Sequence, residues 1–179
     1  MRKNSLWILV LVVALAFGMG TAGAQEVSVG YQGFIGNGQN LLSGLSVRGW
    51  SDQIGYEATI FYGQLNVDFG AGADVDADAW ILDAQLMYAA VEKENSKFYV
   101  GMDFGYGQYD VDPGGPSIDD SIWMVGPLLG AEFSFQGLPE IGFNWEVAYT
   151  FANVDTPSNI GMEIDLSGIN VTAGVHYKF

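Results

Sequence analysis

Strict alternation of apolar and polar residues at the end of the chain is the feature that most constrains its fold. From Ile169 to Phe179 every odd position is apolar, and the even positions between them are small or polar: Asn170, Thr172, Gly174, His176 and Lys178. A period of two is the pattern of a β-strand, whose successive side chains point to opposite faces. The chain therefore predicts a final strand with one wholly apolar face.

The same alternation recurs in earlier parts of the chain. It is clear in four further segments, residues 54–62, 80–88, 98–106 and 141–151, and weaker in residues 27–33, 41–50 and 121–135. Every one of these segments has a length typical of a strand that is apolar on one face. The sequence predicts eight strands.

The predicted connections alternate between short and long. Short turns are expected at residues 51–53, 92–96 and 136–140, and longer Gly-, Asp- and Pro-rich loops at 68–79, 110–120 and 153–165; only the first connection, 35–40, is short on that side. Short periplasmic turns and longer extracellular loops are typical of outer-membrane barrels. An even number of strands puts both ends of the chain on the short-turn, periplasmic side.

The N-terminus has the layout of a secretory signal peptide. Arg2 and Lys3 precede an apolar stretch at residues 6–17, and Ala22-Gly23-Ala24 is a small-x-small cleavage site. The apolar stretch is shorter than the roughly 20 residues of a spanning helix. We expect residues 1–24 to be a signal peptide and 25–179 to form the barrel, with an uncleaved anchor as the alternative.

Charge and composition exclude several classes of function. Residues 25–179 hold four basic and 21 acidic side chains, a formal charge of −17, which repels nucleic-acid phosphates. The chain has no cysteine, which excludes disulfides and zinc-thiolate sites. Charged residues are 15% of the chain, against about 25% in ordinary soluble domains.

A soluble β-sandwich is the alternative to a membrane barrel. Against it, Lys is nearly absent, the non-apolar face is filled with Gly, Ala, Asn, Thr and isolated charges, and aromatic residues concentrate near strand ends, as in membrane-interface girdles. These are Trp50, Tyr56, Trp80, Tyr88, Phe98, Tyr106, Trp123, Phe135, Phe151 and Tyr177. Since open edges are excluded in hydrocarbon, we predict an all-β, eight-stranded antiparallel up-and-down transmembrane barrel.

The chain resembles a known family at its C-terminus and in its overall pattern. The terminal strand Val171-x-Ala173-x-Val175-x-Tyr177-x-Phe179 resembles the signal that outer-membrane proteins present to the barrel assembly machinery. With eight strands, residues 25–179 are similar to the small OmpA-, OmpX- and OmpW-type barrels. This resemblance implies a Gram-negative outer-membrane location, with the assembly machinery, outer-membrane lipid and lipopolysaccharide as partners. We expect a monomer.

The single histidine of the sequence is the residue that could indicate catalysis. Lipid A deacylases, palmitoyltransferases and omptin-type proteases resemble this architecture, and the deacylases and omptins use a histidine near the extracellular end. Here His176 lies at the periplasmic end, and the position two residues beyond it is Lys178, not Ser. We expect no enzyme activity, no cofactor and no catalytic metal.

The alternation directs seven charged side chains into the lumen: Arg48, Glu57, Asp83, Asp103, Glu132, Glu146 and Lys178. Isolated charges in a narrow interior are costly unless they pair or are bridged by water. We interpret them as a salt-bridged plug, as in OmpA-like barrels, because eight strands leave little space beyond their own side chains. The alternative is a thin cation-preferring pore.

Acidic residues cluster in the predicted loops. Asp74, Asp76 and Asp78 alternate in one, and Asp110, Asp112, Asp119 and Asp120 bracket Pro113-Gly114-Gly115-Pro116 in another. Clustered carboxylates suit Ca²⁺, but the run lacks the glycine and distal glutamate of an EF-hand loop. We favour a solvated rim, which could share divalent cations with lipopolysaccharide phosphates.

The sequence therefore predicts a non-enzymatic outer-membrane barrel with a plugged polar lumen and a structural or surface-interaction role. Two alternatives stay open. One is a narrow OmpW-type channel or carrier for small hydrophobic or ionic solutes. The other is a loop-mediated adhesin, although loops of about a dozen residues, without aromatic clusters, are short for that role.

Overall fold

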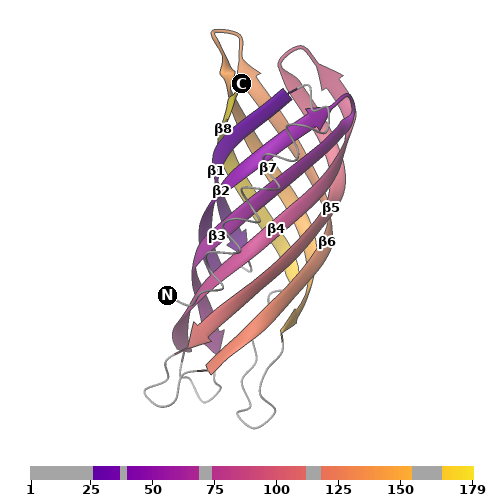
Figure 1. Cartoon of the computed structure of the whole chain (residues 1–179). Helices are drawn as coiled ribbons and strands as arrows, with labels where there is room; N and C mark the ends of the chain where they lie inside the picture. The colour runs from indigo at the N-terminus through magenta and orange to yellow at the C-terminus, as the bar shows by residue number, and fades with distance from the viewer. Residues whose placement is uncertain (1–25, 37–39, 69–73, 112–117, 155–166) are drawn as a thin grey trace.

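Eight antiparallel strands form one closed barrel in the computed structural model of the chain (Figure 1). The structure describes residues 26–36, 40–68, 74–111, 118–154 and 167–179, so the predicted signal peptide lies outside the described residues. The strands are β1 (Glu26–Gly36), β2 (Asn40–Ser51), β3 (Ile54–Asp68), β4 (Asp74–Lys93), β5 (Ser96–Val111), β6 (Ile118–Phe135), β7 (Leu138–Val154) and β8 (Gly168–Lys178). The predicted fold class and strand number are confirmed.

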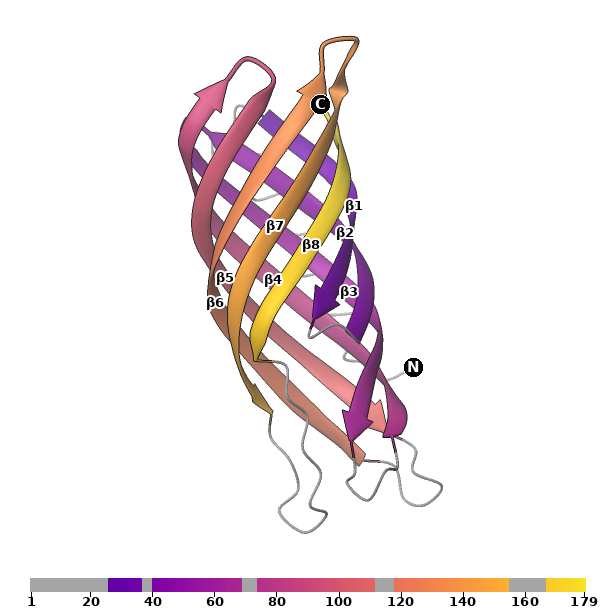
Figure 2. The ribbon, with the colours of Figure 1, turned by 180° about the vertical axis from the view of Figure 1, so that it is seen from behind.

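Closure comes from β1, which pairs with β2 on one side and β8 on the other. Tyr31, for example, lies opposite Leu45 of β2 and Val175 of β8. Figure 2 shows β8 lying beside β1, with all strands strongly tilted. Each described strand has two neighbours, so the sheet has no open edge. The described residues include no helix long and apolar enough to span a membrane.

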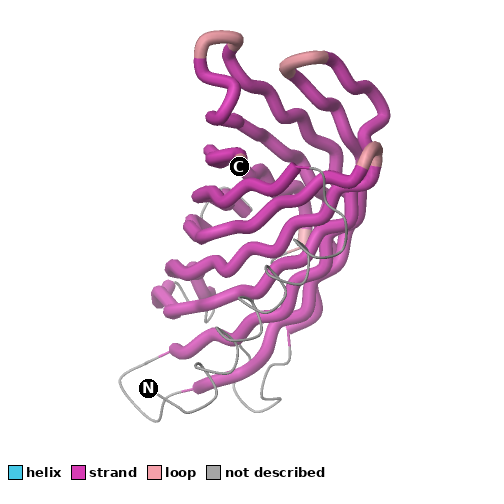
Figure 3. Tube along the Cα trace, turned by 45° about the horizontal axis from the view of Figure 1, so that its top comes forward, coloured by secondary structure: helices cyan, strands magenta, loops and turns pink. Residues whose placement is uncertain are grey.

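Three tight turns mark one end of the barrel, which we call the turn end. They join β2 to β3, β4 to β5 and β6 to β7, and Figure 3 shows them in pink. The C-terminus also lies at this end (Figure 1). Asp52, in the first turn, has a φ of 51°, a left-handed conformation that Asp tolerates better than most residues. The opposite end is called the loop end.

Several strands extend further toward the loop end than the alternation predicted. β4 has 20 residues and β6 has 18. The prediction that Asp74, Asp76, Asp78, Asp110, Asp119 and Asp120 belong to loops is therefore wrong, because all six lie in β4, β5 or β6. Asp and Gly content suggested loops, but the hydrogen-bonded ladder continues past the apolar part of each strand. Asp112 and residues 113–116 lie outside the described residues.

The two faces of the sheet have inverted polarity relative to a soluble protein. Outward side chains are apolar and exposed, as at Leu45 (65%) and Ile169 (65%), whereas inward Arg48 and Glu146 are each 1% exposed. A soluble protein almost never buries such charges while exposing its large apolar side chains. The inversion is the pattern of a barrel whose outer face contacts lipid.

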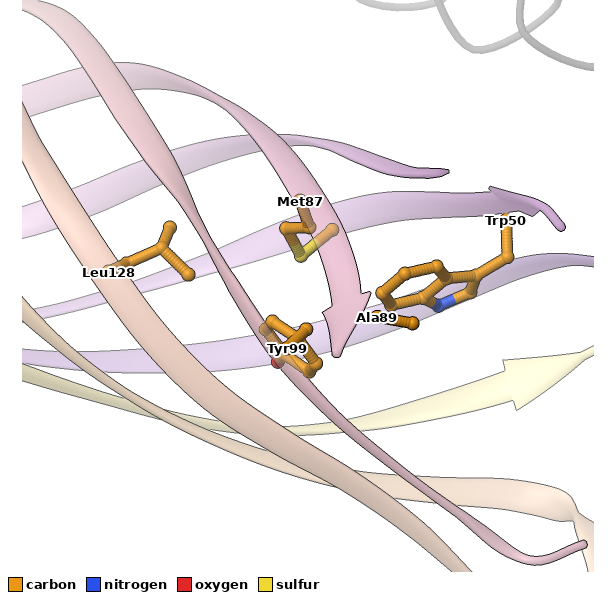
Figure 4. Close-up of a cluster of buried hydrophobic side chains, with 5 residues drawn as sticks. All are labelled: Trp50, Met87, Ala89, Tyr99 and Leu128. Atoms are coloured by element: carbon orange, nitrogen blue, oxygen red, sulfur yellow. The ribbon is translucent and has the colours of Figure 1, made fainter. Parts of the chain in front are cut away.

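Large rings lie flat against glycines on the inner wall. A Cβ atom on Gly130 would come 2.6 Å from the Tyr99 ring, and one on Gly55 would come equally close to Trp50. These glycines let Tyr99 and Trp50 pack with Met87, Ala89 and Leu128 inside the barrel (Figure 4). The prediction that Trp50 belongs to an outer girdle is wrong. Trp50 is two residues from the inward Arg48 and therefore shares its face.

Candidate functional site: a charged and closed lumen

Arg48 connects opposite walls of the barrel. Glu57 lies directly across from it on β3 and accepts from Nε at 2.9 Å and from Nη2 at 2.5 Å. From the other side of the lumen, Glu132 of β6 accepts from Nη1 at 3.1 Å and Glu146 of β7 accepts from Nη2 at 2.5 Å. One fully buried guanidinium thus pairs with three buried carboxylates.

Neutral polar side chains complete these bonds. The Tyr99 hydroxyl donates to Glu146 at 2.7 Å and accepts from Arg48 at 3.1 Å. Gln85 Nε2 donates to Glu146 at 3.0 Å, and Gln32 donates to Glu57. Buried carboxylates are expensive unless hydrogen-bonded on several sides, and these contacts supply that compensation.

Lysines close the network at the turn end. Lys178 Nζ lies 2.7 Å from Glu132 and 3.1 Å from Glu26. Lys97 Nζ lies 3.0 Å from the other Glu26 oxygen and 4.8 Å from the centre of the Trp50 ring. The turn-end mouth is therefore covered by ion pairs anchored on β1, β5, β6 and β8.

The seven charged residues predicted to face the lumen divide into two groups. Arg48, Glu57, Glu132, Glu146 and Lys178 meet in the network described above. Asp83 and Asp103 are also buried and line one cavity with Glu146, but no ion pair joins them to a described basic side chain, and their carboxyl groups lie next to each other. Sequence reasoning did not single out Lys97, Tyr99, Gln85 or Gln32 as partners.

An apolar layer lies between the charges and the loop end. Its members are buried, inward-facing side chains: Phe34, Leu42, Phe61, Ile81, Ile122 and Met124. Phe34 and Phe61 are in ring contact, with centroids 5.8 Å apart. The expectation of an inner face made of small residues and isolated charges is therefore wrong for this layer, and the buried cluster of Trp50, Met87, Tyr99 and Leu128 departs from it nearer the turn end. The lumen is closed twice, by ion pairs and by apolar packing.

Ser46, His176 and Glu57 form a constellation that could suggest nucleophilic catalysis. Ser46 Oγ lies 2.7 Å from His176 Nε2, and Glu57 Oε1 lies 3.1 Å from the same nitrogen. In a catalytic triad the carboxylate holds the other ring nitrogen, Nδ1. All three side chains are also buried inside the lumen. This geometry makes the histidine a hydrogen-bonding residue of the plug.

No three His, Cys, Asp or Glu side chains within the described ranges are grouped to hold a metal ion.

The paired ladder between β6 and β7 has a gap of two residues, with the same register on both sides of it. The pairs Val125↔Phe151 and Leu128↔Ala148 are formed, but Gly126 and Pro127 have no partner on β7. Proline has no backbone N–H to donate to a ladder. An apolar groove of about 770 Å³ lies on the outer face here, and Pro127 is part of its lining. Leu128 and Ala148 line both this groove and a small cavity inside the lumen.

A closed eight-stranded antiparallel barrel with an apolar outer face and a polar, plugged interior defines the class of small transmembrane β-barrels. Solved structures share this fold. The outer membrane protein OprG from Pseudomonas aeruginosa superposes with a TM-score of 0.58 at 17% identity, over 88% of this chain and 97% of that one. A major outer membrane protein from Thermus thermophilus gives 0.54 at 12% identity, over 87% and 100%.

Neisserial surface protein A gives a TM-score of 0.52 at 16% identity, over 86% of this chain and 95% of that one. At these identities the likeness establishes the fold, which is that of small eight-stranded outer-membrane barrels. No protein-family model matches the sequence, and no curated protein matches it either.

Proposed function

We propose that this chain is a non-enzymatic outer-membrane barrel that does not conduct solutes along its axis and has a structural or surface-interaction role. The observation that carries this proposal is the double closure of the lumen. Arg48 bonds to acids from three other strands, and Phe34 of β1 and Phe61 of β3 pack against each other inside the barrel on the loop side of it. Because an eight-stranded barrel is barely wider than its own side chains, either layer is enough to exclude a hydrated ion.

Conductance in planar lipid bilayers tests this proposal. The folded protein should insert without opening discrete channels. As a positive control, Arg48→Ala combined with Phe61→Ala removes one side chain from each closure and should produce conductance if the variant folds. Folding is checked by the faster gel migration of the unboiled barrel. Regular channel openings by the wild-type barrel would contradict the proposal.

A carrier for small apolar solutes is the second candidate, and the interrupted ladder favours it. Beside Pro127 the outer groove and the inner cavity share Leu128 and Ala148 in their linings. Pro127→Val restores a backbone N–H, which should complete the ladder between β6 and β7 and separate the outer groove from the inner cavity. If the protein is a carrier, uptake of an apolar fluorescent dye into vesicles should fall in this variant. Pro139→Val, near the turn of β7, is the matched control.

We further propose that the turn end lies in the periplasm and that β8 carries the assembly signal. Val171, Ala173, Val175 and Tyr177 all face outward on β8, and Phe179 is 80% exposed at the turn end. This continuous apolar face is available to the barrel assembly machinery until the barrel inserts. Aromatic side chains at such an end favour the membrane interface.

The loop end lacks basic residues, which suggests how it meets lipopolysaccharide. All four basic residues of 25–179, Arg48, Lys93, Lys97 and Lys178, belong to the turn-end half of their strands. Direct pairing of lipid phosphates with lysine or arginine is therefore not available at the loop end. We propose that contact with lipopolysaccharide there depends on divalent cations, and that chelation should weaken it.

A further inference from the structure

Positive charge is unevenly distributed inside the barrel. Five carboxylates are buried in the lumen, at Glu57, Asp83, Asp103, Glu132 and Glu146, and Arg48 is the one buried Arg or Lys side chain among the described residues. Lys178 reaches in from the mouth to Glu132. The three glutamates therefore have basic partners. No ion pair joins Asp83 or Asp103 to a described basic side chain.

Asp83 and Asp103 face one another across β4 and β5. Gln85 lies directly opposite Asp103 and Gly105 directly opposite Asp83, so the two aspartates are diagonal neighbours on the inner face. Their carboxyl groups lie within hydrogen-bonding reach of each other. Two adjacent buried carboxylates repel strongly unless something positive lies between them.

Two buried oxygens without hydrogen-bond partners belong to residues that line one cavity. Asp103 is 8% exposed, and its Oδ1 has no hydrogen-bond partner. Gln85 donates its Nε2 to Glu146, which leaves its Oε1 buried and without a donor. Asp83, Asp103 and Gln85 all line an enclosed cavity of about 20 Å³. A cavity of this size holds one water-sized particle.

We propose that Asp83, Asp103 and Gln85 form an internal binding site for a monovalent alkali cation such as Na⁺. The two carboxylates and the amide oxygen supply hard oxygen ligands and the negative charge that the ion requires. Ca²⁺ takes six to eight oxygens and Mg²⁺ demands a near-octahedral shell, which this smaller ligand set does not supply.

The position of the site determines when the ion binds. Ile81, Phe61 and Met124 also line the cavity and separate the carboxylates from the loop end. The Arg48 network closes the lumen on the turn side. An ion enclosed in this way is taken up as the barrel folds, so its binding stabilises the folded state by mass action.

Unfolding by urea in detergent tests the site, with NaCl compared against N-methylglucamine chloride at equal ionic strength. N-methylglucamine is too large for the cavity. At a Na⁺ concentration ten times its dissociation constant, the equilibrium constant for unfolding should be about tenfold lower than in the organic salt. Asp103→Asn should abolish this difference. Asp110→Asn, an exposed carboxylate at the loop end of the same strand, is the matched control and should keep it.

Equal stability in the two salts would overturn the proposal, since a proton shared by the carboxyls would then balance their charge. Greater stabilisation by Ca²⁺ than by Na⁺ would also overturn it. If Asp103→Asn does not fold, crystals of wild-type protein folded in RbCl provide a second measurement. Anomalous density from Rb⁺ between Asp83 and Asp103 supports the site, and its absence refutes it.

Discussion

Replacing Arg48 by Met removes the buried guanidinium of the lumen while keeping most of the side-chain volume. In the folded protein Glu57, Glu132 and Glu146 would then lose four hydrogen bonds from a single side chain. Lys178 still pairs with Glu132, so two carboxylates remain without a lysine or arginine partner. Leaving one partner of a buried pair uncompensated costs about 3 to 5 kcal/mol.

Lys97→Met provides the matched control for this prediction. Lys97 also forms two ion pairs, with Glu26 and Glu92, but its side chain is 13% exposed and theirs are 31% and 47% exposed. Such solvent-screened pairs contribute about 0 to 1 kcal/mol. Urea titration in detergent, followed by the band shift between folded and unfolded barrel, measures both variants. Equal losses for Arg48→Met and Lys97→Met would refute the role given to the buried network.

The cause can be separated from simple misfolding by adding Glu57→Gln and Glu146→Gln to Arg48→Met. The triple variant removes the two carboxylates that the single variant leaves uncompensated. Replacing a buried ion pair by neutral groups of similar volume is often close to neutral in stability. We therefore expect the triple variant to recover most of the lost free energy. If it is less stable than Arg48→Met alone, packing rather than charge explains the loss.

Three further predictions concern the outer face, the loop end and the C-terminus. Leu86→Arg, on an exposed outer position, should cost about 2 to 4 kcal/mol in lipid vesicles, while Leu138→Arg at the turn end should cost about 0 to 1. Asp110→Asn should raise stability by up to about 1 kcal/mol at low salt, because Asp110 pairs in register with Asp78, and the gain should shrink in 1 M salt. Deleting Phe179 should reduce insertion in cells but leave refolding in detergent intact, as measured by membrane fractionation and gel shift.

The strand pattern was predictable from sequence because each strand repeats a simple rule. A period of two fixes the face of every residue in a strand once one position is assigned. Glu57, Glu132 and Glu146 are buried, as this alternation (the parity of each position) requires. The same rule places Trp50 inside with Arg48. Its assignment to the outer girdle failed because aromatic character near a strand end was given more weight than parity.

The partners inside the lumen were less accessible to sequence reasoning. Parity places Arg48 in the lumen but does not state which of the inward acids it meets, since that depends on strand tilt and on the stagger of the barrel. Glu146 lies 98 residues from Arg48, yet the two side chains are 2.5 Å apart. The inward position of Lys97 could have been predicted, because it lies on the same face of its strand as Tyr99 and Asp103.

The loop-end layer shows why a lumen of mixed polarity still forms a stable interior. Phe34 and Phe61 occupy inward positions that in a wide pore would contact water, but in an eight-stranded barrel they contact each other. Their packing excludes water from the region beside Arg48, and low water content strengthens every ion pair there. The same exclusion makes an unpaired carboxylate more costly. The apolar layer that stabilises the Arg48 network therefore also creates the need for a counter-charge at Asp83 and Asp103.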